Sequence, residues 1–361
     1  MKPNHLLTAT VLLLSVTSCD TYYRMTSRIE KDGSMYREVY AQGDSAFRAG
    51  DMTHNPFLFE LDADWQVDNP DSAIQFNFWG KNEKLNARVS RKIPVIDGEY
   101  FSVSKEKEYA RPLAVPHEQL KKNFRWFYTY YIYTATYQEL PDKGPVPLSN
   151  YLNEEEQAIW LHGDNAAYDG LNGIELNDKL DNLEAKFGEW YQRSMYEISW
   201  EIVRHFTSQQ GDTAYIHRLD ELKDVVYNKF LAKHNDWENA EAKQVCNFFD
   251  KECRTEYFSK LYKKNKGAID AMGEEKICVA NLFYHAIQFE VTMPGRILST
   301  NARTLSDGNT AIWKIDGFRL LAGDYVLRAE SQIINYWAFA ITLLAILAVF
   351  VAFIKLYRRR A

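Results

Sequence analysis

The feature that most constrains this chain of 361 residues is an uncharged apolar segment near its C-terminus, Tyr336–Ile354. As an α-helix with a rise of about 1.5 Å per residue, the segment is roughly 28 Å long, close to the hydrocarbon thickness of a bilayer. Aromatic residues stand at its ends and basic residues follow it, as is typical of a membrane helix with a cytoplasmic end. A buried core helix is the alternative, but a core helix would not end in three arginines. We therefore predict a transmembrane helix at 334–357 and a basic cytoplasmic tail at 358–361.

The N-terminus predicts export. Lys2 precedes an apolar run, Leu6–Val16, that is too short to span a bilayer. A positive start, a short apolar core and small residues before a cut site are typical of a secretory signal. The stretch Val16-Thr17-Ser18-Cys19 is similar to a bacterial lipobox, in which the cysteine is lipidated. We predict a lipoprotein signal peptide at 1–18 and lipidation of Cys19; an ordinary signal peptide with a chance cysteine is the alternative.

Together these segments predict the topology. Export places residues 20–333 on the extracytoplasmic side, facing the periplasm, while the C-terminus stays in the cytoplasm. A single apolar helix indicates the bacterial inner (cytoplasmic) membrane, because outer-membrane spans are normally barrels. Asp20 resembles the retention signal of enterobacterial lipoproteins, which adds mild support. The expected partners are membrane lipid, through the acyl anchor and the helix, and an envelope protein or a further lipid.

The charge balance excludes one class of partner. Lys2 and the four basic residues at the C-terminus contribute +5 to the net charge of −6, so the exported part carries −11. A nucleic-acid-binding protein usually shows a basic surplus, and we expect no nucleic acid. The overall field of the exported part does not attract anionic lipid, although its basic residues can still cluster locally.

The exported part separates into three zones by pattern. Residues 19–116 and 276–333 contain short alternating apolar and polar stretches with turn signals between them, which is typical of β-structure. The clearest turn signals are Lys31-Asp32-Gly33-Ser34 and Asp307-Gly308-Asn309. The expected strands are Tyr22–Ile29, Met35–Tyr40, Ile74–Trp79, Leu85–Val89, Ile287–Met293, Arg296–Thr300, Ala311–Ile315 and Tyr325–Glu330.

The middle zone, 117–275, opens with the aromatic stretch Phe124–Tyr137, whose composition favours one strand. His117–Asn123 before it is compatible with a short helical lead-in. Apolar residues then recur every three or four positions, which predicts a long helix from about Asn177 to Ser208. Further helices are expected at Ile216–Leu231 and Asp236–Lys264, so this zone reads as an inserted helical subdomain.

The predicted fold class is α+β: an antiparallel β-rich membrane-proximal domain with an inserted helical subdomain and a C-terminal transmembrane helix. The simplest assembly pairs zones 19–116 and 276–333 in one antiparallel sheet, with the helical zone inserted between them. This assembly would bring Cys19 and the membrane helix to the same side, as a double tether requires.

The last zone also carries a family resemblance. The stretches that carry it are Met293–Asn301, Asp307–Trp313 and Leu327–Ser331, followed by the membrane helix. This run resembles the LppM-type bacterial lipoproteins, in which a lipobox, an early hairpin and such a C-terminal run belong together. The match covers roughly 100 residues at the two ends, and the inserted part has no counterpart in the common members. The resemblance implies a cell-envelope lipoprotein with a compact β-rich domain over the membrane, in a family of poorly defined function.

Motifs for catalysis or cofactors are not found. The eight histidines show no zinc-protease spacing, and there is no nucleophile elbow, phosphate loop or dinucleotide fingerprint. We expect no catalytic residues, no metal site and no cofactor. Cys246, Cys253 and Cys278 are compatible with one disulfide that includes Cys278, or with buried thiols.

The aromatic stretch is the best candidate for ligand binding. Aromatic side chains fall on both faces of the expected strand, so a one-sided core does not explain them. The candidate ligand-binding residues are Trp126, Tyr128, Tyr130, Tyr131 and Tyr133. The alternative is a central strand that is covered on both faces.

The sequence thus predicts a membrane-anchored cell-envelope lipoprotein, an extracytoplasmic binding or structural module of unknown ligand, and not an enzyme. The alternative is an envelope-associated hydrolase with an unrecognised active site.

Overall fold

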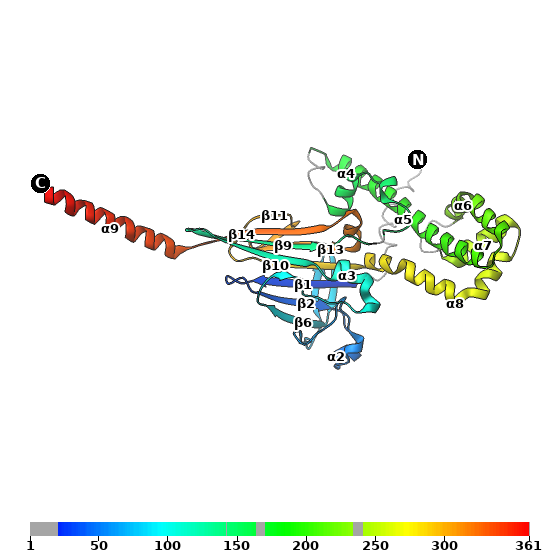
Figure 1. Ribbon diagram of the computed structural model, residues 1–361, viewed down its shortest axis with the longest axis horizontal. Helices are drawn as coiled ribbons and strands as arrows, with labels where there is room; N and C mark the ends of the chain where they lie inside the picture. Colours follow the sequence, from blue (N-terminus) through cyan, green and yellow to red (C-terminus); the bar gives the residue numbers. More distant parts are fainter. Residues whose placement is uncertain (1–20, 142, 164–169, 234–240, 361) are drawn as a thin grey trace, which may run out of the picture. The chain divides into compact units, whose positions relative to one another are not determined.

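The computed structural model describes residues 21–141, 143–163, 170–233 and 241–360, so the predicted signal peptide and Cys19 lie outside the described residues. The fold is α+β, as predicted, with antiparallel-rich sheets and a C-terminal apolar helix (Figure 1). The chain forms two compact units. The β unit comprises the chain up to Gln138, Tyr284–Asp316 and Asp324–Ala361; the helical unit comprises Glu139–Phe283 and Gly317–Gly323.

The larger sheet of the β unit combines both ends of the chain. Its seven strands lie in the order β12-β13-β10-β1-β2-β6-β3. Their bounds are β1 Thr21–Ile29, β2 Met35–Ala41, β3 Gln66–Val67, β6 Ala87–Ile93, β10 His285–Thr292, β12 Thr304–Ser306 and β13 Thr310–Asp316. The predicted shared sheet is confirmed, but β1 and β10 pair in parallel, because the chain enters both strands from the same end. The expected purely antiparallel pairing is therefore wrong at this central pair.

The second sheet contains the aromatic stretch. Its order is β11-β14-β9-β8-β7. The bounds are β7 Asp97–Gly98, β8 His117–Phe124, β9 Tyr128–Tyr137, β11 Arg296–Thr300 and β14 Tyr325–Ile334; a separate two-stranded sheet pairs β4 Ile74–Phe78 with β5 Lys81–Leu85. The predicted strand in the aromatic stretch is confirmed over Tyr128–Tyr137, which form β9, while Phe124 ends β8 and 125–127 form the turn between the two strands. The helical lead-in expected at His117–Asn123 is wrong, since those residues belong to β8. The aromatic strand belongs to the β unit, and the helical unit begins at Glu139.

A buried ion pair joins the two sheets. Arg37 of β2 binds Glu118 of β8 through two hydrogen bonds of 2.6 and 2.7 Å, and both side chains are 0% exposed. Ser27 accepts from the Arg37 Nε atom at 2.9 Å, and the Tyr133 hydroxyl donates to Glu118. Burial opposes the charge of Arg37, but the adjacent Glu118 raises its pKa above the ordinary value. Each side chain supplies the opposite charge and the hydrogen bonds that the other needs once it is removed from water.

The strand directions define two ends of the β unit. The C-terminal helix α9 (Tyr336–Arg360) follows β14, whose last residue Ile334 pairs with Tyr128 of β9. The β1–β2 turn lies at this same end, because the Tyr131 hydroxyl donates to the Lys31 carbonyl at 2.7 Å. Thr21 begins β1 about 26 Å from that end, at 3.3 Å per residue. β1 therefore runs toward α9, and its first residue lies at the other end of the β unit. Cys19, which is expected on the same side as the membrane helix, lies outside the described residues.

The helical unit is built on one long helix, α5 (Gly173–Gln209), whose predicted extent is close to the observed one. Asn172 and Glu175 form a capping box at its start. The other helices are α4 Glu154–Gln157, α6 Thr213–Lys233, α7 Ala242–Cys253 and α8 Tyr257–Ile277, while α2 Ser45–Arg48 and α3 Arg111–Ala114 belong to the β unit.

The single helix expected at Asp236–Lys264 is two helices. Arg254 ends α7 in the left-handed conformation, with a φ angle of 51°. The Asp250 carboxylate then accepts hydrogen bonds from the backbone amides of Phe258 and Ser259, each at 2.9 Å, and so stabilises the first turn of α8.

Candidate membrane-interface site

Within the described residues, α9 is one helix that is long and apolar enough to cross a membrane. Its apolar stretch is only 6% buried, whereas the core helix of a globular protein hides an apolar face. The chain is thus an α+β protein with a C-terminal helix that fits a bilayer span.

The turn of the β8–β9 hairpin packs against the start of this helix. We call residues 124–128 the hairpin tip; Figure 1 shows it projecting from the sheet toward α9. Phe124 stacks on Trp337 with ring centroids 6.2 Å apart, and Trp126 meets the same indole edge-on at 5.3 Å. Phe127 lies 4.5 Å from Phe339. A strand turn and the first helical turns therefore form one aromatic cluster.

Trp126 extends furthest along the helix. Its indole Nε1 donates to the Thr342 hydroxyl at 2.8 Å. Thr342 lies six residues beyond Tyr336, or about 9 Å along the axis. Trp126 nevertheless remains 45% exposed and Phe124 remains 58% exposed. Exposed aromatic side chains beside the end of an apolar helix match the belt at a membrane–water interface, where an apolar ring and a polar atom are both accommodated.

Asn335 holds the hairpin tip on the helix. Its side-chain amide donates to the carbonyls of Arg125 (2.9 Å) and Trp126 (3.2 Å), and its backbone amide donates to the carbonyl of Phe127 (2.9 Å). Its side-chain oxygen accepts from the Thr129 hydroxyl at 3.1 Å. Because unpaired carbonyls are costly outside water, this pairing suits a turn at a lipid interface.

The structure separates the predicted ligand-binding residues into two groups. Trp126 lies in the cluster with α9, Tyr128 packs edge-on against Phe339, and Tyr130 lies beside Tyr128 on the half-exposed face of β9. Tyr131 and Tyr133 point between the sheets and are 1% and 0% exposed. Burial and the neighbouring Glu118 raise the pKa of Tyr133 well above its usual range, so its hydroxyl stays protonated as a donor.

Sequence reasoning did not single out Phe124, Phe127 or Asn335 as site residues. The available signal was Asn335 itself, since asparagine directly before an apolar helical run is a common N-terminal capping residue. Its contacts with the hairpin tip, some 210 positions earlier in the chain, have no local signature.

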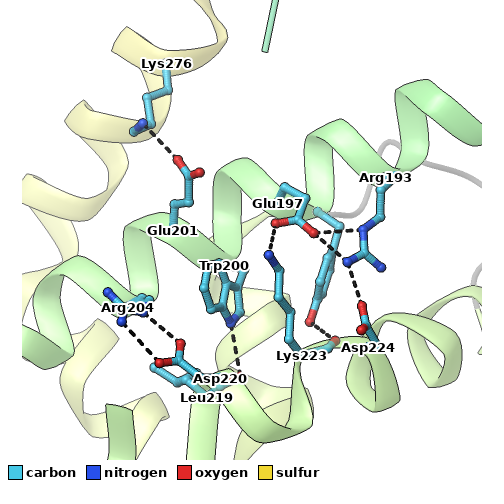
Figure 2. A network of polar contacts seen from close by, with 11 residues as sticks. Arg193, Glu197, Trp200, Glu201, Arg204, Leu219, Asp220, Lys223, Asp224 and Lys276 are labelled. Atoms are coloured by element: carbon cyan, nitrogen blue, oxygen red, sulfur yellow. Dashed lines mark hydrogen bonds and ion pairs between the residues drawn. The ribbon is translucent and has the colours of Figure 1, made fainter. Parts of the chain in front are cut away.

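The helical unit contains a network of ion pairs on α5 and α6, shown in Figure 2. Glu197, nearly buried, lies between Arg193 and Lys223, and Arg193 also binds Asp224 at 2.6 Å. A second pair joins Arg204 to Asp220 at 2.7 Å. The Lys223 ammonium lies 4.0 Å from the centre of the Trp200 ring. Each labelled charge has an opposite partner, so the network stabilises the contact between the two helices.

One cavity of about 190 Å³ lies within the helical unit. Trp190 and Tyr191 line it, together with the Glu201–Lys276 pair. Ser194 also lines it, and its buried hydroxyl has no partner among the described residues. Among the residues that line the cavity, Glu201 is the one carboxylate, and it is paired with Lys276; none is a histidine.

The described residues contain no group of three or more His, Cys, Asp or Glu side chains that could hold a metal ion. Cys246 and Cys253 are free thiols, so neither forms a disulfide. Burial raises the pKa of Cys246 to about 12, as expected of a structural thiol and not of a nucleophile.

No protein-family model matches the chain, and no curated protein matches it. A solved structure with partial similarity is the NMR structure of the folded domain of LppM from Mycobacterium tuberculosis, at 7% sequence identity, covering 88% of this chain and 91% of that chain. The TM-score is 0.23, which is too low to support an argument about fold or function.

Proposed function

We propose that the protein is a membrane-anchored module of a bacterial cell envelope, with the part between its anchors on the extracytoplasmic side of the inner membrane. It acts as a binding or structural module at the membrane surface and not as an enzyme. The observation that carries the proposal is the packing of the hairpin tip against the first turns of α9. A soluble binding domain on a flexible tether would not need such a contact.

The aromatic contact implies that the β unit rests on the bilayer. If α9 spans the membrane from Tyr336, the Trp126 ring lies about 9 Å past the start of the span. That depth falls within the roughly 5–10 Å to which the apolar faces of interfacial elements insert. The hairpin tip therefore acts as a second membrane contact that limits rotation of the β unit about α9.

Lipidation of Cys19 would impose a further condition on this arrangement. Thr21 lies about 26 Å from the end of the β unit that carries α9, and two residues of chain add at most about 7 Å. For the acyl chain and α9 to enter the same bilayer, the strands must lie along the membrane surface and not along its normal.

Topology and anchoring are tested separately in cells. Cys19→Ala should abolish palmitate labelling, and a reporter fused after Ala361 should be active only in the cytoplasm. Trp79 is an exposed residue of the β4–β5 hairpin. The thiol introduced by Trp79→Cys should react with a membrane-impermeant maleimide added outside the inner membrane. Labelling of residue 79 only after permeabilisation of that membrane would reverse the proposed orientation.

A further inference from the structure

Basic side chains surround the hairpin tip. Lys121 and Lys122 lie near the end of β8, Arg125 lies in the turn, and Lys31 lies in the facing β1–β2 turn. We call these four residues the basic cluster. All four are exposed, and none forms an ion pair with another described residue.

Two contacts of Lys122 join the end of β8 to the facing β1–β2 turn. Its Nζ atom donates to the Lys31 carbonyl at 2.7 Å and lies 5.5 Å from the centre of the Tyr131 ring. Arg125 is bracketed in sequence by Phe124 and Trp126, the residues that contact Trp337. The four cations therefore gather at the end of the β unit from which the apolar helix leaves.

The nearby carboxylates do not neutralise the cluster. Asp32 accepts hydrogen bonds from the Ser34 amide and hydroxyl at 2.9 and 2.7 Å. These bonds, and more weakly Lys92 and Lys122, hold the pKa of Asp32 below its usual range. Glu30 binds Arg28 at 2.7 Å. Asp32 therefore contributes one negative charge beside the four positive charges of the cluster and that of Lys92.

Several other arginines of the same unit form ion pairs. Arg88 binds Asp68 and Glu38, and Arg91 binds Asp62 and Asp64. Among the described residues of this unit, Arg48, Arg296 and Arg303 also form no ion pair, so it is the gathering of four such cations at one place that distinguishes the cluster. Four unpaired cations beside the hairpin tip favour an anionic ligand from outside the chain.

We infer that the basic cluster binds the phosphate groups of anionic phospholipids in the membrane that α9 crosses. The inference rests on the proposed membrane contact and names its lipid partner. Lysine and arginine donate charge-assisted hydrogen bonds to phosphate oxygens, and a juxtamembrane basic cluster attracts anionic lipids at short range. The aromatic rings then occupy the apolar edge of the interface, and the cations occupy the head-group layer.

A cross-linking experiment with the full chain tests the inference at the tip itself. A photo-reactive phenylalanine analogue replaces Asn123, an exposed residue of β8, and the protein is reconstituted in vesicles of phosphatidylcholine with phosphatidylglycerol. Mass spectrometry gives the ratio of the two lipid adducts relative to their ratio in the bilayer. We expect phosphatidylglycerol to be enriched among the adducts of the wild-type cluster. In Lys31→Gln/Lys121→Gln/Lys122→Gln this enrichment should fall by at least about five-fold, since each lysine near an anionic surface contributes about that factor.

Two further variants make the result decisive. Lys260→Gln/Lys263→Gln/Lys264→Gln removes three exposed charges from α8 and should keep the enrichment. Replacing the three cluster lysines with arginine should also keep it, which separates loss of charge from misfolding. An unchanged ratio in the cluster Gln variant, or an equal loss in the α8 variant, would overturn the inference.

The two proposals fail in different ways. If residue 126 lies at membrane depth in phosphatidylcholine vesicles but adducts show no preference for phosphatidylglycerol, only the anionic-lipid inference fails. If residue 126 lies in water in either vesicle, the membrane contact itself fails.

Discussion

The indole nitrogen of Trp126 donates to the hydroxyl of Thr342 across 2.8 Å, and this bond joins a strand turn to an apolar helix more than 200 residues away. In the proposed arrangement, this hydrogen bond gives the indole N–H a partner at a depth where water is scarce. It also leaves the ring faces of the hairpin tip available for lipid, since Trp126 and Phe124 remain about half exposed.

Removing the acceptor should loosen the hairpin tip. Thr342→Val keeps the shape of the side chain but leaves the indole N–H without its partner, at a cost of about 1–3 kcal/mol. We expect faster hydrogen exchange at the amides of the hairpin tip in proteoliposomes. Thr342→Ser, which retains the hydroxyl, is the control, and equal exchange in both variants would contradict the role of this bond.

Asn335 should matter more than Thr342. Asn335→Ala leaves the carbonyls of Arg125 and Trp126 without their donor, and two lost hydrogen bonds correspond to about 2–3 kcal/mol. Asn335→Asp preserves the acceptor for Thr129 but removes the same donors, so it should behave like Ala. Spin-label mobility at residue 126 measures the effect; wild-type mobility in the Asp variant would show that the donors are dispensable.

Removing one partner of the Arg37–Glu118 pair should destabilise the β unit more than removing both. Glu118→Gln leaves a buried guanidinium without its counter-charge and should destabilise the unit by about 3–5 kcal/mol. Arg37→Met/Glu118→Leu removes both charges and should recover most of the loss. Denaturation in urea, followed by the exchange of β2 and β8 amides, measures both; a double variant no more stable than the single would refute this account.

His285 should make the β unit acid-sensitive. Burial, and secondarily Lys107, lowers its pKa below the ordinary value of about 6.5, and its Nδ1 lies 3.5 Å from the Tyr23 hydroxyl. The unfolded chain then binds a proton that the folded chain resists, so stability is full above about pH 6.5 and falls as the pH drops below it.

Replacing His285 and replacing His54 should change the acid sensitivity of the β unit in opposite directions. In His285→Gln, the urea midpoint for hydrogen-exchange protection of the β10 amides should fall less as the pH is lowered. Asp44 raises the pKa of the exposed His54, so its stabilisation is present at low pH and is lost as the pH rises. His54→Gln should therefore steepen the acid loss, and a flatter profile in that variant would contradict the assignment.

The sequence was most informative where structure is set locally. Alternation of period two predicted β4 and β10. The Asp32-Gly33 turn between two strand-like stretches predicted β1, β2 and the first hairpin, in which Gly33 has a φ angle of 102°. The length and apolarity of the last segment predicted α9. These features depend on neighbouring residues alone.

What could not be predicted depends on distant partners. The hairpin tip contains no glycine, proline or asparagine, and its carbonyls are instead paired by Asn335. The break between α7 and α8 falls at Arg254 where a glycine would be the usual signal, and Asp250 compensates by capping α8. The parallel pairing of β1 with β10 joins segments more than 250 residues apart.

The depth of residue 126 in a bilayer shows whether the hairpin tip lies in lipid or in water. A nitroxide amino acid introduced during synthesis at residue 126 of the full chain, so that native thiols are not labelled, reports collisions in proteoliposomes with oxygen, which concentrates in lipid, and with a water-soluble nickel complex. A nitroxide at the exposed Trp79 serves as the reference in the same unit. Our account predicts that oxygen dominates at residue 126 and the nickel complex at residue 79. Equal and high accessibility of both positions to nickel would show that the hairpin tip lies in water, and would contradict the membrane-surface module.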